Sequence, residues 1–242
     1  MRNFSGKRYW LIGASEGLGE ALARKMSVAG AELILSARDE TKLKAIVETL
    51  PNKATALSCD VGSQISVDDT VSQLRDVDGV VYLAGVYWPM HATEWKSAEA
   101  TKMVDINLTG AMRTLGPVVQ KFVERDEGHV VITGSLVGFR GLPRSIGYTA
   151  AKAGLMTLAE SMHYDLRKTG ISVQMVNPGY IKTRLTKKNR FKMPMIMEPE
   201  AAAEVMFQHM RTNSFSKNFP WPLSTLFRIG PLLPSALYYR LY

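Results

Sequence analysis

The sequence lacks several features that define whole classes of protein. It has a single cysteine, Cys59, so no intramolecular disulfide can form, and no Cys/His cluster has the spacing of zinc ligands. No stretch reaches the roughly 20 apolar residues of a membrane span. Lys7 and Arg8 interrupt the apolar core that a signal peptide would need. We therefore expect a cytoplasmic protein from a reducing compartment, without a metal site.

Acidic residues are scarce at one end of the chain. The 242 residues carry 30 Lys and Arg against 22 Asp and Glu, a net charge of +8. Residues 1–181 are close to neutral, whereas residues 182–242 hold 10 basic and only 3 acidic side chains. Evenly spread positive charge would favour a nucleic-acid partner. A near-neutral body with a basic end does not, so no nucleic acid is expected.

Short apolar runs alternate with longer helical patterns, as in a parallel sheet covered by helices. This rhythm predicts a single-domain α/β fold, a doubly wound parallel sheet of the Rossmann type. The catalytic domain is expected over 1–213, with a lid at about 182–198 and a helix over 199–211, and a C-terminal helical extension over 214–242. The predicted strands are 9–12, 32–37, 54–60, 79–84, 129–133 and 171–176, and the helices are about 17–30, 40–50, 64–75, 101–125 and 147–169.

A glycine-rich turn directly follows the first apolar run. It reads Gly13-Ala14-Ser15-Glu16-Gly17-Leu18-Gly19, and a helical pattern starts at once. Glycines permit close backbone approach, while free N–H groups and the positive end of the helix dipole face an anion. Such a turn can serve only as a sharp bend, but its place in a βαβ unit favours a dinucleotide pyrophosphate site. The residues expected to bind the cofactor here are Gly13, Ser15, Gly17, Leu18 and Gly19.

The end of the second strand indicates which dinucleotide is bound. An acidic residue there would hold an NAD ribose, but the sequence is Ser36-Ala37-Arg38, and an arginine fork can pair with a 2′-phosphate. NADP(H) is therefore predicted over NAD(H), the alternative being a solvent-facing arginine with no cofactor role. Glu16 opposes this prediction, because it puts negative charge near the phosphates. Asp60, followed by Val61 after the third strand, is placed to accept a hydrogen bond from the adenine amino group.

A tyrosine and a lysine stand one helical turn apart near the start of a helix, in Tyr148-Thr149-Ala150-Ala151-Lys152. An adjacent ammonium would lower the tyrosine pKa from its usual value of about 10 and favour proton exchange. Upstream, Ser135 follows a buried-looking strand and could hydrogen-bond a substrate oxygen at the ligand-binding edge of the sheet. Taken singly, these residues are ordinary packing or turn residues. Their convergence with the glycine turn at one sheet edge favours catalysis.

These motifs resemble the short-chain dehydrogenase/reductase family, specifically its single-domain branch with a Tyr-x-x-x-Lys site. The likeness runs from about Lys7 to Thr183 and more weakly to about Arg211. The resemblance implies that Tyr148 exchanges the proton, that Lys152 lowers its pKa and holds the nicotinamide ribose, and that Ser135 orients the carbonyl. It also implies that Asn107 keeps a water in a proton relay. The nicotinamide is expected beside Pro178, Gly179, Ile181 and Thr183.

Two positions depart from the family pattern. Ile12 precedes the first glycine, where threonine is frequent, and Leu83-Ala84-Gly85 replaces an asparagine-alanine-glycine sequence. The change at Leu83 removes a structural hydrogen bond but no catalytic group, and Ala84 and Gly85 are still expected at the cofactor. The predicted function is an NADP-dependent oxidoreductase acting on a carbonyl or secondary alcohol. The alternative is a catalytically silent sensor or scaffold of the same fold.

The substrate is expected to be a small, apolar molecule. Aromatic and methionine side chains in loops 86–95, 136–146 and the segment after Pro178 predict an adaptable pocket, among them Tyr87, Trp88, Phe191, Met193 and Met195. Packing against the core or a partner subunit is an equally open reading of these side chains. His91 is expected to be a surface or packing histidine and not a catalytic one.

The basic end remains open to several interpretations. Residues 182–192 hold six basic side chains and no acidic one, either to attract an anionic substrate or as a solvated surface. Residues 215–242 contain two short amphipathic patterns divided by Gly230-Pro231, one with Leu223, Leu226 and Phe227 and one with Leu233, Leu237 and Leu241. They predict packing on the chain itself or on a subunit of a homo-oligomer, a dimer or tetramer, with peripheral membrane contact as the alternative.

Overall fold

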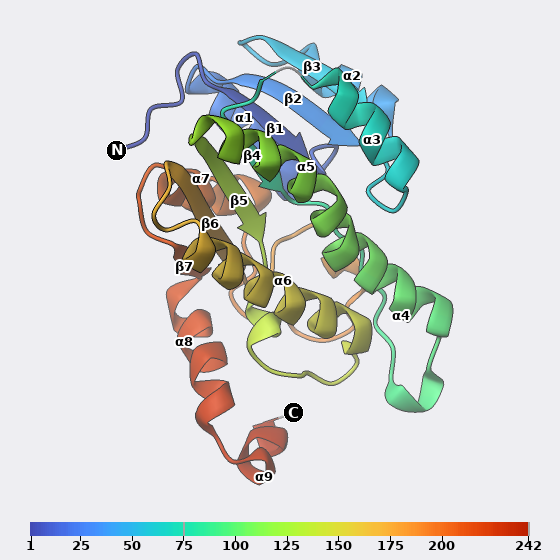
Figure 1. Cartoon of the computed structure of the whole chain (residues 1–242). Coiled ribbons are helices and arrows are strands. Elements are labelled where there is room, and N and C mark those ends of the chain that lie inside the picture. The colour runs from blue at the N-terminus through green and yellow to red at the C-terminus, as the bar shows by residue number, and fades with distance from the viewer. Residues whose placement is uncertain (75, 242) are drawn as a thin grey trace.

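The computed structural model describes residues 1–74 and 76–241, except for the side chain of Leu241. Its centre is a seven-stranded, wholly parallel sheet in the order β3-β2-β1-β4-β5-β6-β7 (Figure 1). The predicted doubly wound fold is confirmed. The strands are β1 (Arg8–Ile12), β2 (Glu32–Ala37), β3 (Ala54–Ser58), β4 (Gly79–Tyr82), β5 (Gly128–Thr133), β6 (Ile171–Pro178) and β7 (Ser216–Phe219).

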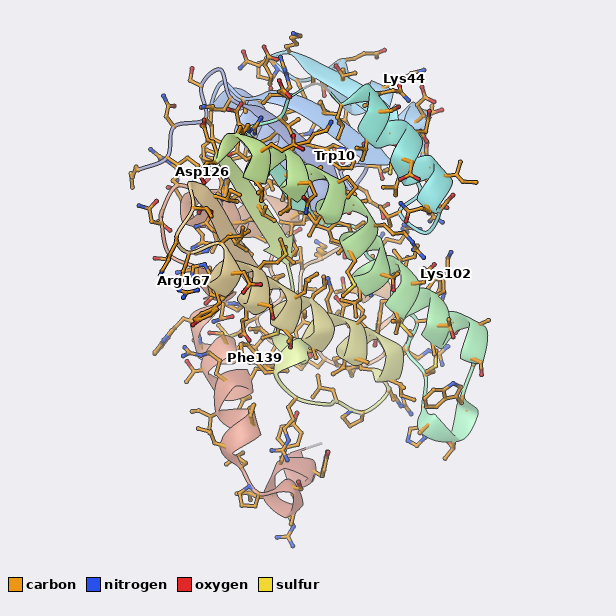
Figure 2. All side chains as sticks on the ribbon, in the orientation of Figure 1. Trp10, Lys44, Lys102, Asp126, Phe139 and Arg167 are labelled. Carbon is orange, nitrogen blue, oxygen red and sulfur yellow. The ribbon has the colours of Figure 1, made fainter. Side chains whose placement is uncertain are left out.

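The central strands β4 and β5 are buried along their whole length because helices cover both faces of the sheet. Trp10 in β1 is completely buried, and its indole N–H donates to Ser36 Oγ at 2.8 Å. Figure 2 shows Trp10 within the packed interior, whereas Lys44 and Lys102 lie on outer helix surfaces.

Two apolar clusters, one on each face, hold helices to the sheet. One packs Leu11 and Leu22 with side chains of three helices. The other packs Trp10, Phe122 and Leu155. The first face carries α1 (Gly17–Val28), α2 (Glu40–Val47) and α7 (Pro199–Met210), and the second carries α3 (Gln64–Gln73), α5 (Gly110–Arg125) and α6 (Ile146–Asp165).

The helix expected over 101–125 starts earlier and contains an irregular turn. It begins as α4 (Ser97–Val104), continues through a π-helical turn at Asp105–Thr109, and ends as α5. Single π turns inside α-helices occur frequently at functional sites. This one contains Asn107. In the helix expected over 64–75, α3 ends at Gln73, and Arg75 lies outside the described residues.

The seventh strand, β7, is missing from the six predicted strands. It has the sequence Ser-Lys-Asn-Phe and pairs in parallel with β6, with Met175 opposite Ser216. Three of its four residues are polar, because an edge strand can face solvent, so it shows no apolar run. The sheet therefore uses residues beyond 213. Within the predicted lid, the regular structure is one short 3₁₀ turn, Thr186–Lys188.

The C-terminal extension folds back onto its own chain. It comprises α8 (Trp221–Ile229), a 3₁₀ turn at Gly230–Leu232, α9 (Ser235–Tyr238) and a last 3₁₀ turn at Tyr239–Leu241. Leu223 and Phe227 pack against Leu136. Self-packing, one of the predicted alternatives, is therefore observed. Within the described ranges, none of the helices combines the length and apolar character that crossing a membrane requires.

Candidate active site

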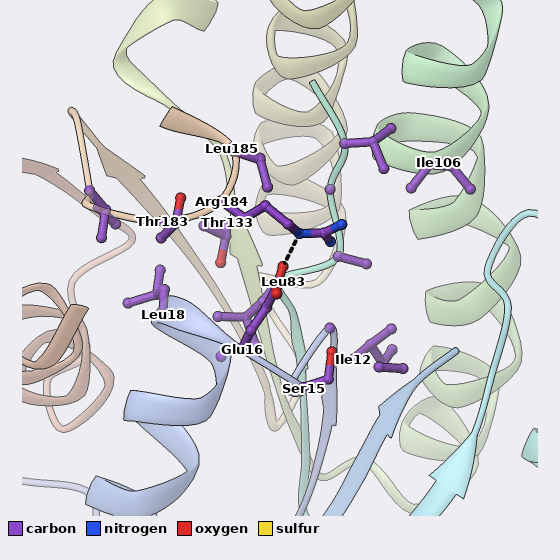
Figure 3. A pocket seen from close by; sticks show the side chains of 18 of the residues that line it. Ile12, Ser15, Glu16, Leu18, Leu83, Ile106, Thr133, Thr183, Arg184 and Leu185 are labelled. Atoms are coloured by element: carbon purple, nitrogen blue, oxygen red, sulfur yellow. Dashed lines mark hydrogen bonds and ion pairs between the residues drawn. The ribbon is translucent and has the colours of Figure 1, made fainter. Parts of the chain in front are cut away.

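A cavity of about 350 Å³ opens at the carboxyl ends of the strands (Figure 3). Its walls come from the glycine turn, from the segments that follow β2 to β6, and from the first part of the lid. In open α/β sheets this edge is where ligands bind. Every residue that the sequence assigned to the cofactor lines it: Gly13, Ser15, Gly17, Leu18, Gly19, Arg38, Asp60, Val61, Ala84, Gly85, Tyr148, Lys152, Pro178, Gly179, Ile181 and Thr183.

The glycine turn forms a cradle that only glycine permits. Gly13 has φ +92°, and a Cβ on it would lie 2.5 Å from the backbone N of Ala84. A Cβ on Gly19 would lie 2.2 Å from the carbonyl oxygen of Gly13. Helix α1 starts at Gly17, and the preceding Glu16 makes no side-chain capping bond, so the first N–H groups are left for a ligand. This geometry suits the pyrophosphate of a dinucleotide.

Glu16 does not leave its negative charge unbalanced beside that cradle. Its carboxylate accepts a hydrogen bond from Arg184 Nε at 2.8 Å, the dashed contact in Figure 3. Arg184 belongs to the lid, so the ion pair joins the lid to the glycine turn across the cavity. The ion pair offsets the charge of Glu16, so this carboxylate opposes phosphate binding less than the sequence suggested.

A second cation accompanies Arg38 at the far end of the cavity. Lys42, in the first turn of α2, also lines this end, while Asp39 caps the helix by accepting from the Lys42 N–H at 3.1 Å. Lys42 was not predicted, although its place in the first turn of the helix that follows Arg38 was a usable signal. Asp60 lines the same cavity, and one of its oxygens accepts from the Gly62 N–H at 2.9 Å.

Ser135, Tyr148 and Lys152 lie together at the other end of the cavity. Ser135 follows β5 and caps a short 3₁₀ turn, Leu136–Phe139, through Val137 N–H at 3.4 Å. Tyr148 is in the first turn of α6. Lys152 is 4% exposed, and its ammonium donates to the Thr133 carbonyl at 2.8 Å and lies 5.8 Å from the Tyr148 ring centroid.

Burial shifts the pKa values of Tyr148 and Lys152 in opposite directions. It raises the pKa of Tyr148 to about 12, and a hydrogen bond with Ser135 offsets part of that rise. It also lowers the pKa of Lys152 to about 8. The Lys152 ammonium is directed at the Thr133 carbonyl and is not among the groups that shift the pKa of Tyr148, so its lowering of the tyrosine pKa stays a prediction. Tyr148 is thus a protonated phenol at neutral pH, suited to donate a proton.

Asn107 is placed differently from the other three predicted catalytic residues. It is completely buried, and its amide exchanges two hydrogen bonds with the backbone of Val86, at 2.7 and 3.0 Å. It does not line the cavity, so its side chain holds the loop after β4 in place. Its part in a proton relay stays a prediction.

One polar atom at the cavity was not anticipated. Thr133 Oγ1 is buried and has no hydrogen-bond partner in the described part of the chain, and Thr133 lines the cavity. Buried polar groups are normally paired. Its position at the end of β5 was the only sequence signal for it. The oxygen itself is buried, so this unpaired hydroxyl is not assigned to a ligand.

A smaller, mainly apolar cavity of about 100 Å³ adjoins the first, and Ser135 and Tyr148 line both. Of the predicted pocket residues, Tyr87 and Phe191 line it. Trp88 instead lies under the Lys188 ammonium, 4.6 Å from its ring, and Met195 is exposed. His91 is exposed, which is one of the two predicted alternatives. The extension supplies two unpredicted side chains, Leu223 and Phe227.

A glycine cradle leading to a Ser, Tyr and Lys cluster defines a Rossmann-type, dinucleotide-dependent oxidoreductase. Residues 7–194 match the family model described as short chain dehydrogenase. The chain is similar to an uncharacterized oxidoreductase of Myxococcus xanthus, 33% identical over 98% of this chain and 97% of that one. It is also similar to a 3-oxoacyl-[acyl-carrier-protein] reductase of Rickettsia typhi, 31% identical over 78% of each chain.

Among solved structures, the fold resembles the closed form of a serine dehydrogenase complexed with NADP⁺. The TM-score is 0.82 at 21% identity, over 89% of this chain and 95% of that one. The chain belongs to the short-chain dehydrogenase/reductase family. Its fold is accordingly one that binds a nicotinamide dinucleotide, and its class of activity is oxidoreduction.

We predict that Gly19→Ala weakens binding of both NADPH and NADH about 10- to 100-fold, because the added Cβ displaces the turn and its N–H groups. Fluorescence titration of the reduced cofactor measures this. Gly116→Ala is the matched control, since an added Cβ there meets nothing within 4 Å in α5. The control should bind normally and gain about 1 kcal/mol of stability. Equal affinities for Gly19→Ala and wild type would contradict the cradle.

We also predict a pH-dependent stability difference between wild type and Lys152→Met. Because burial lowers the pKa of Lys152 from 10.5 to about 8, the folded state releases this proton before the unfolded state does. Between pH 8 and 10.5, the free energy of unfolding of wild type should rise by about 3 kcal/mol relative to that of Lys152→Met. Below pH 8, the difference between the two free energies should not change with pH. Urea titrations across this range measure it, with the exposed Lys168→Met as the control. A constant difference from wild type would contradict the predicted pKa.

Proposed function

We propose that the protein is an NADP(H)-dependent oxidoreductase that transfers hydride between the nicotinamide and an apolar carbonyl or secondary alcohol. The observation that carries this proposal is the position of Ser135 and Tyr148, which line both cavities. One cavity has the cradle for a dinucleotide, and the other is walled mainly by apolar side chains. A substrate oxygen at their junction would be within reach of both hydroxyls.

Each catalytic side chain would have a separate role in such a reaction. A bound nicotinamide would supply the hydride to the carbonyl carbon, or accept it in the reverse direction. Tyr148, protonated at neutral pH with a pKa of about 12, gives its proton to the substrate oxygen. Ser135 donates a hydrogen bond to the same oxygen and stabilises the charge that develops on it. Lys152, with a pKa of about 8, is largely charged at pH 7 and stabilises the phenolate left on Tyr148.

The proposed preference for NADP(H) rests on two cations and on an engaged carboxylate. Arg38 and Lys42 line the end of the cavity beyond β2, where a 2′-phosphate would lie. Ala37 is not acidic, and Asp39, which also lines the cavity, caps α2 and lies 3.8 Å from the Lys42 ammonium, which offsets its charge. The site therefore has positive charge for the extra phosphate and little to repel it.

The proposed substrate class is a small apolar carbonyl compound. The smaller cavity is lined by Tyr87, Phe191, Leu223 and Phe227 together with other apolar side chains. The Rickettsia relative is named for reduction of a 3-oxoacyl group, which also pairs a carbonyl with an apolar chain. Both observations favour a carbonyl carried on an aliphatic or aromatic group.

We further propose a cytoplasmic homo-oligomer, a dimer or tetramer, in which the extension begins after β7, the last strand of the catalytic sheet. Exposed apolar side chains on α5 and α6 support subunit pairing through these helices. Met112 and Val123 are 50% and 48% exposed, and Tyr164 is 63% exposed. These three side chains offer apolar surface that a subunit contact through the two helices would cover.

We expect Tyr148→Phe to lower NADPH oxidation with a ketone panel about 10²- to 10⁴-fold, because the proton donor is lost while the ring is retained. The measurement is the loss of NADPH absorbance, with NADPH affinity determined in parallel and expected to change little. Tyr164→Phe, on the exposed side of the same helix, should react like wild type. A wild type that binds NADPH tightly yet reacts no faster than Tyr148→Phe would instead indicate a silent sensor.

We expect Arg38→Gln to reduce affinity for NADPH about 10- to 100-fold while leaving NADH affinity nearly unchanged, since a charge-assisted contact to the 2′-phosphate is lost. Lys42→Gln should act in the same direction, and the double variant should bind the two cofactors about equally. Lys44→Gln, on the same helix outside the cavity, is the control. A parallel loss of NADH and NADPH binding in Arg38→Gln would contradict the proposed phosphate contact.

A further inference from the structure

Helix α8 is apolar on both of its faces. On the inner face, Leu223 and Phe227 are 7% and 8% exposed and pack against the body of the protein. On the outer face, Trp221, Leu226 and Ile229 are 77%, 53% and 46% exposed. Large apolar side chains on a helix normally face the core, with polar residues on the opposite face. Half of this one has no covering within the described chain.

The apolar surface continues beyond α8 through the next turns of the extension. Leu232 is 82% exposed, Leu237 50% and Tyr239 58%. Single exposed apolar side chains are ordinary on protein surfaces, but six large ones within residues 221–239 are not. We call these six residues the outer surface of the extension: Trp221, Leu226, Ile229, Leu232, Leu237 and Tyr239.

Only positive charge accompanies the outer surface. Lys217, Arg228 and Arg240 are exposed, and among the residues that the structure describes none of them forms a salt bridge. Residues 215–242 contain no acidic side chain. The combination of exposed Trp and Leu with Arg is typical of a segment that lies at a lipid interface.

The extension presents this surface in a fixed position. Arg140 donates to the carbonyls of Gly230 and Leu233 at 2.5 and 2.7 Å and to Ser235 Oγ at 3.0 Å. Its guanidinium also lies 4.1 Å from the Tyr238 ring centroid. The surface is therefore held against the loop after β5 before any partner binds, and little ordering would be required on docking.

We propose that the outer surface of the extension docks peripherally on an anionic lipid bilayer. A second copy of the chain fits this surface less well. A two-fold interface would place the same patch against itself and bring Arg228 and Arg240 of each copy together without an acidic partner. An anionic bilayer accepts the apolar side chains and neutralises the arginines at once.

Docking would also bring the smaller cavity close to the bilayer, because the inner face of α8 lines that cavity through Leu223 and Phe227. An apolar substrate could then pass from the lipid to Tyr148 without crossing much water. This consequence rests on the proposed function, whereas the docking itself does not. Vesicle binding is therefore measured without turnover, so that its failure leaves the enzyme assignment untouched.

The test is co-sedimentation of the full chain with vesicles of phosphatidylcholine mixed with phosphatidylglycerol, and with vesicles of phosphatidylcholine alone. Wild type should bind the anionic vesicles at least tenfold more strongly, and added salt should weaken this binding. The triple variant Trp221→Ser/Leu226→Ser/Ile229→Ser should lose about tenfold or more in binding. Arg228→Gln/Arg240→Gln, which changes only exposed charges, should lose most of the preference for anionic lipid.

The matched control is Val28→Ser/Ile65→Ser/Trp95→Ser, which removes exposed side chains of the same kinds elsewhere on the molecule. It should bind vesicles like wild type. Equal sedimentation of wild type with and without vesicles would overturn the proposal. It would also be overturned if the control variant lost as much vesicle binding as the triple variant of the outer surface. An oligomer that dissociates in the outer-surface variant, with no vesicle binding by wild type, would overturn it and assign the surface to a second copy.

Discussion

The close approach of the turn after β1 to the end of β4 is the constraint on which the site depends. A Cβ on Gly13 would lie 2.5 Å from the Ala84 backbone N, and a Cβ on Gly19 would overlap the Gly13 carbonyl oxygen. This contact lets α1 begin directly at the sheet edge, with its uncapped N–H groups facing the cavity. A side chain at either glycine would push the helix away and remove the anion cradle. The Glu16–Arg184 ion pair then joins the lid to this same turn.

The parallel sheet brings the reacting side chains to that edge. All strands end on the same side, so Ser135 after β5 and Gly179 after β6 meet at the cavity, while α6 returns Tyr148 and Lys152 to it. Burial then favours the neutral form of both groups, raising the pKa of Tyr148 and lowering that of Lys152. At neutral pH the phenol is therefore protonated, while the lysine, with a pKa of about 8, is still mainly charged.

Much of this arrangement could be predicted because it follows from local pattern. The residues that end strands and start helices, such as Gly13, Arg38 and Ser135, are found at the cavity because parallel strands share one edge. The strand β7 could not be predicted, since four largely polar residues at a sheet edge carry no apolar pattern. Leu223 and Phe227 were not assigned to the smaller cavity, because their place depends on the fold-back held by Arg140. The direction of the Tyr148 pKa shift follows from the burial of its hydroxyl, which helix spacing does not specify.

Hydride transfer at the junction of the two cavities is tested most directly by isotope tracing. NADPH carrying deuterium at the transferable position of the nicotinamide is incubated with the protein and a panel of apolar ketones, and the alcohol products are analysed by mass spectrometry. One deuterium on the carbinol carbon of the product, with formation of NADP⁺, is the predicted result for wild type. Alcohol formed without deuterium, or no deuterium transfer to any ketone by a protein that binds NADPH, would contradict the assignment.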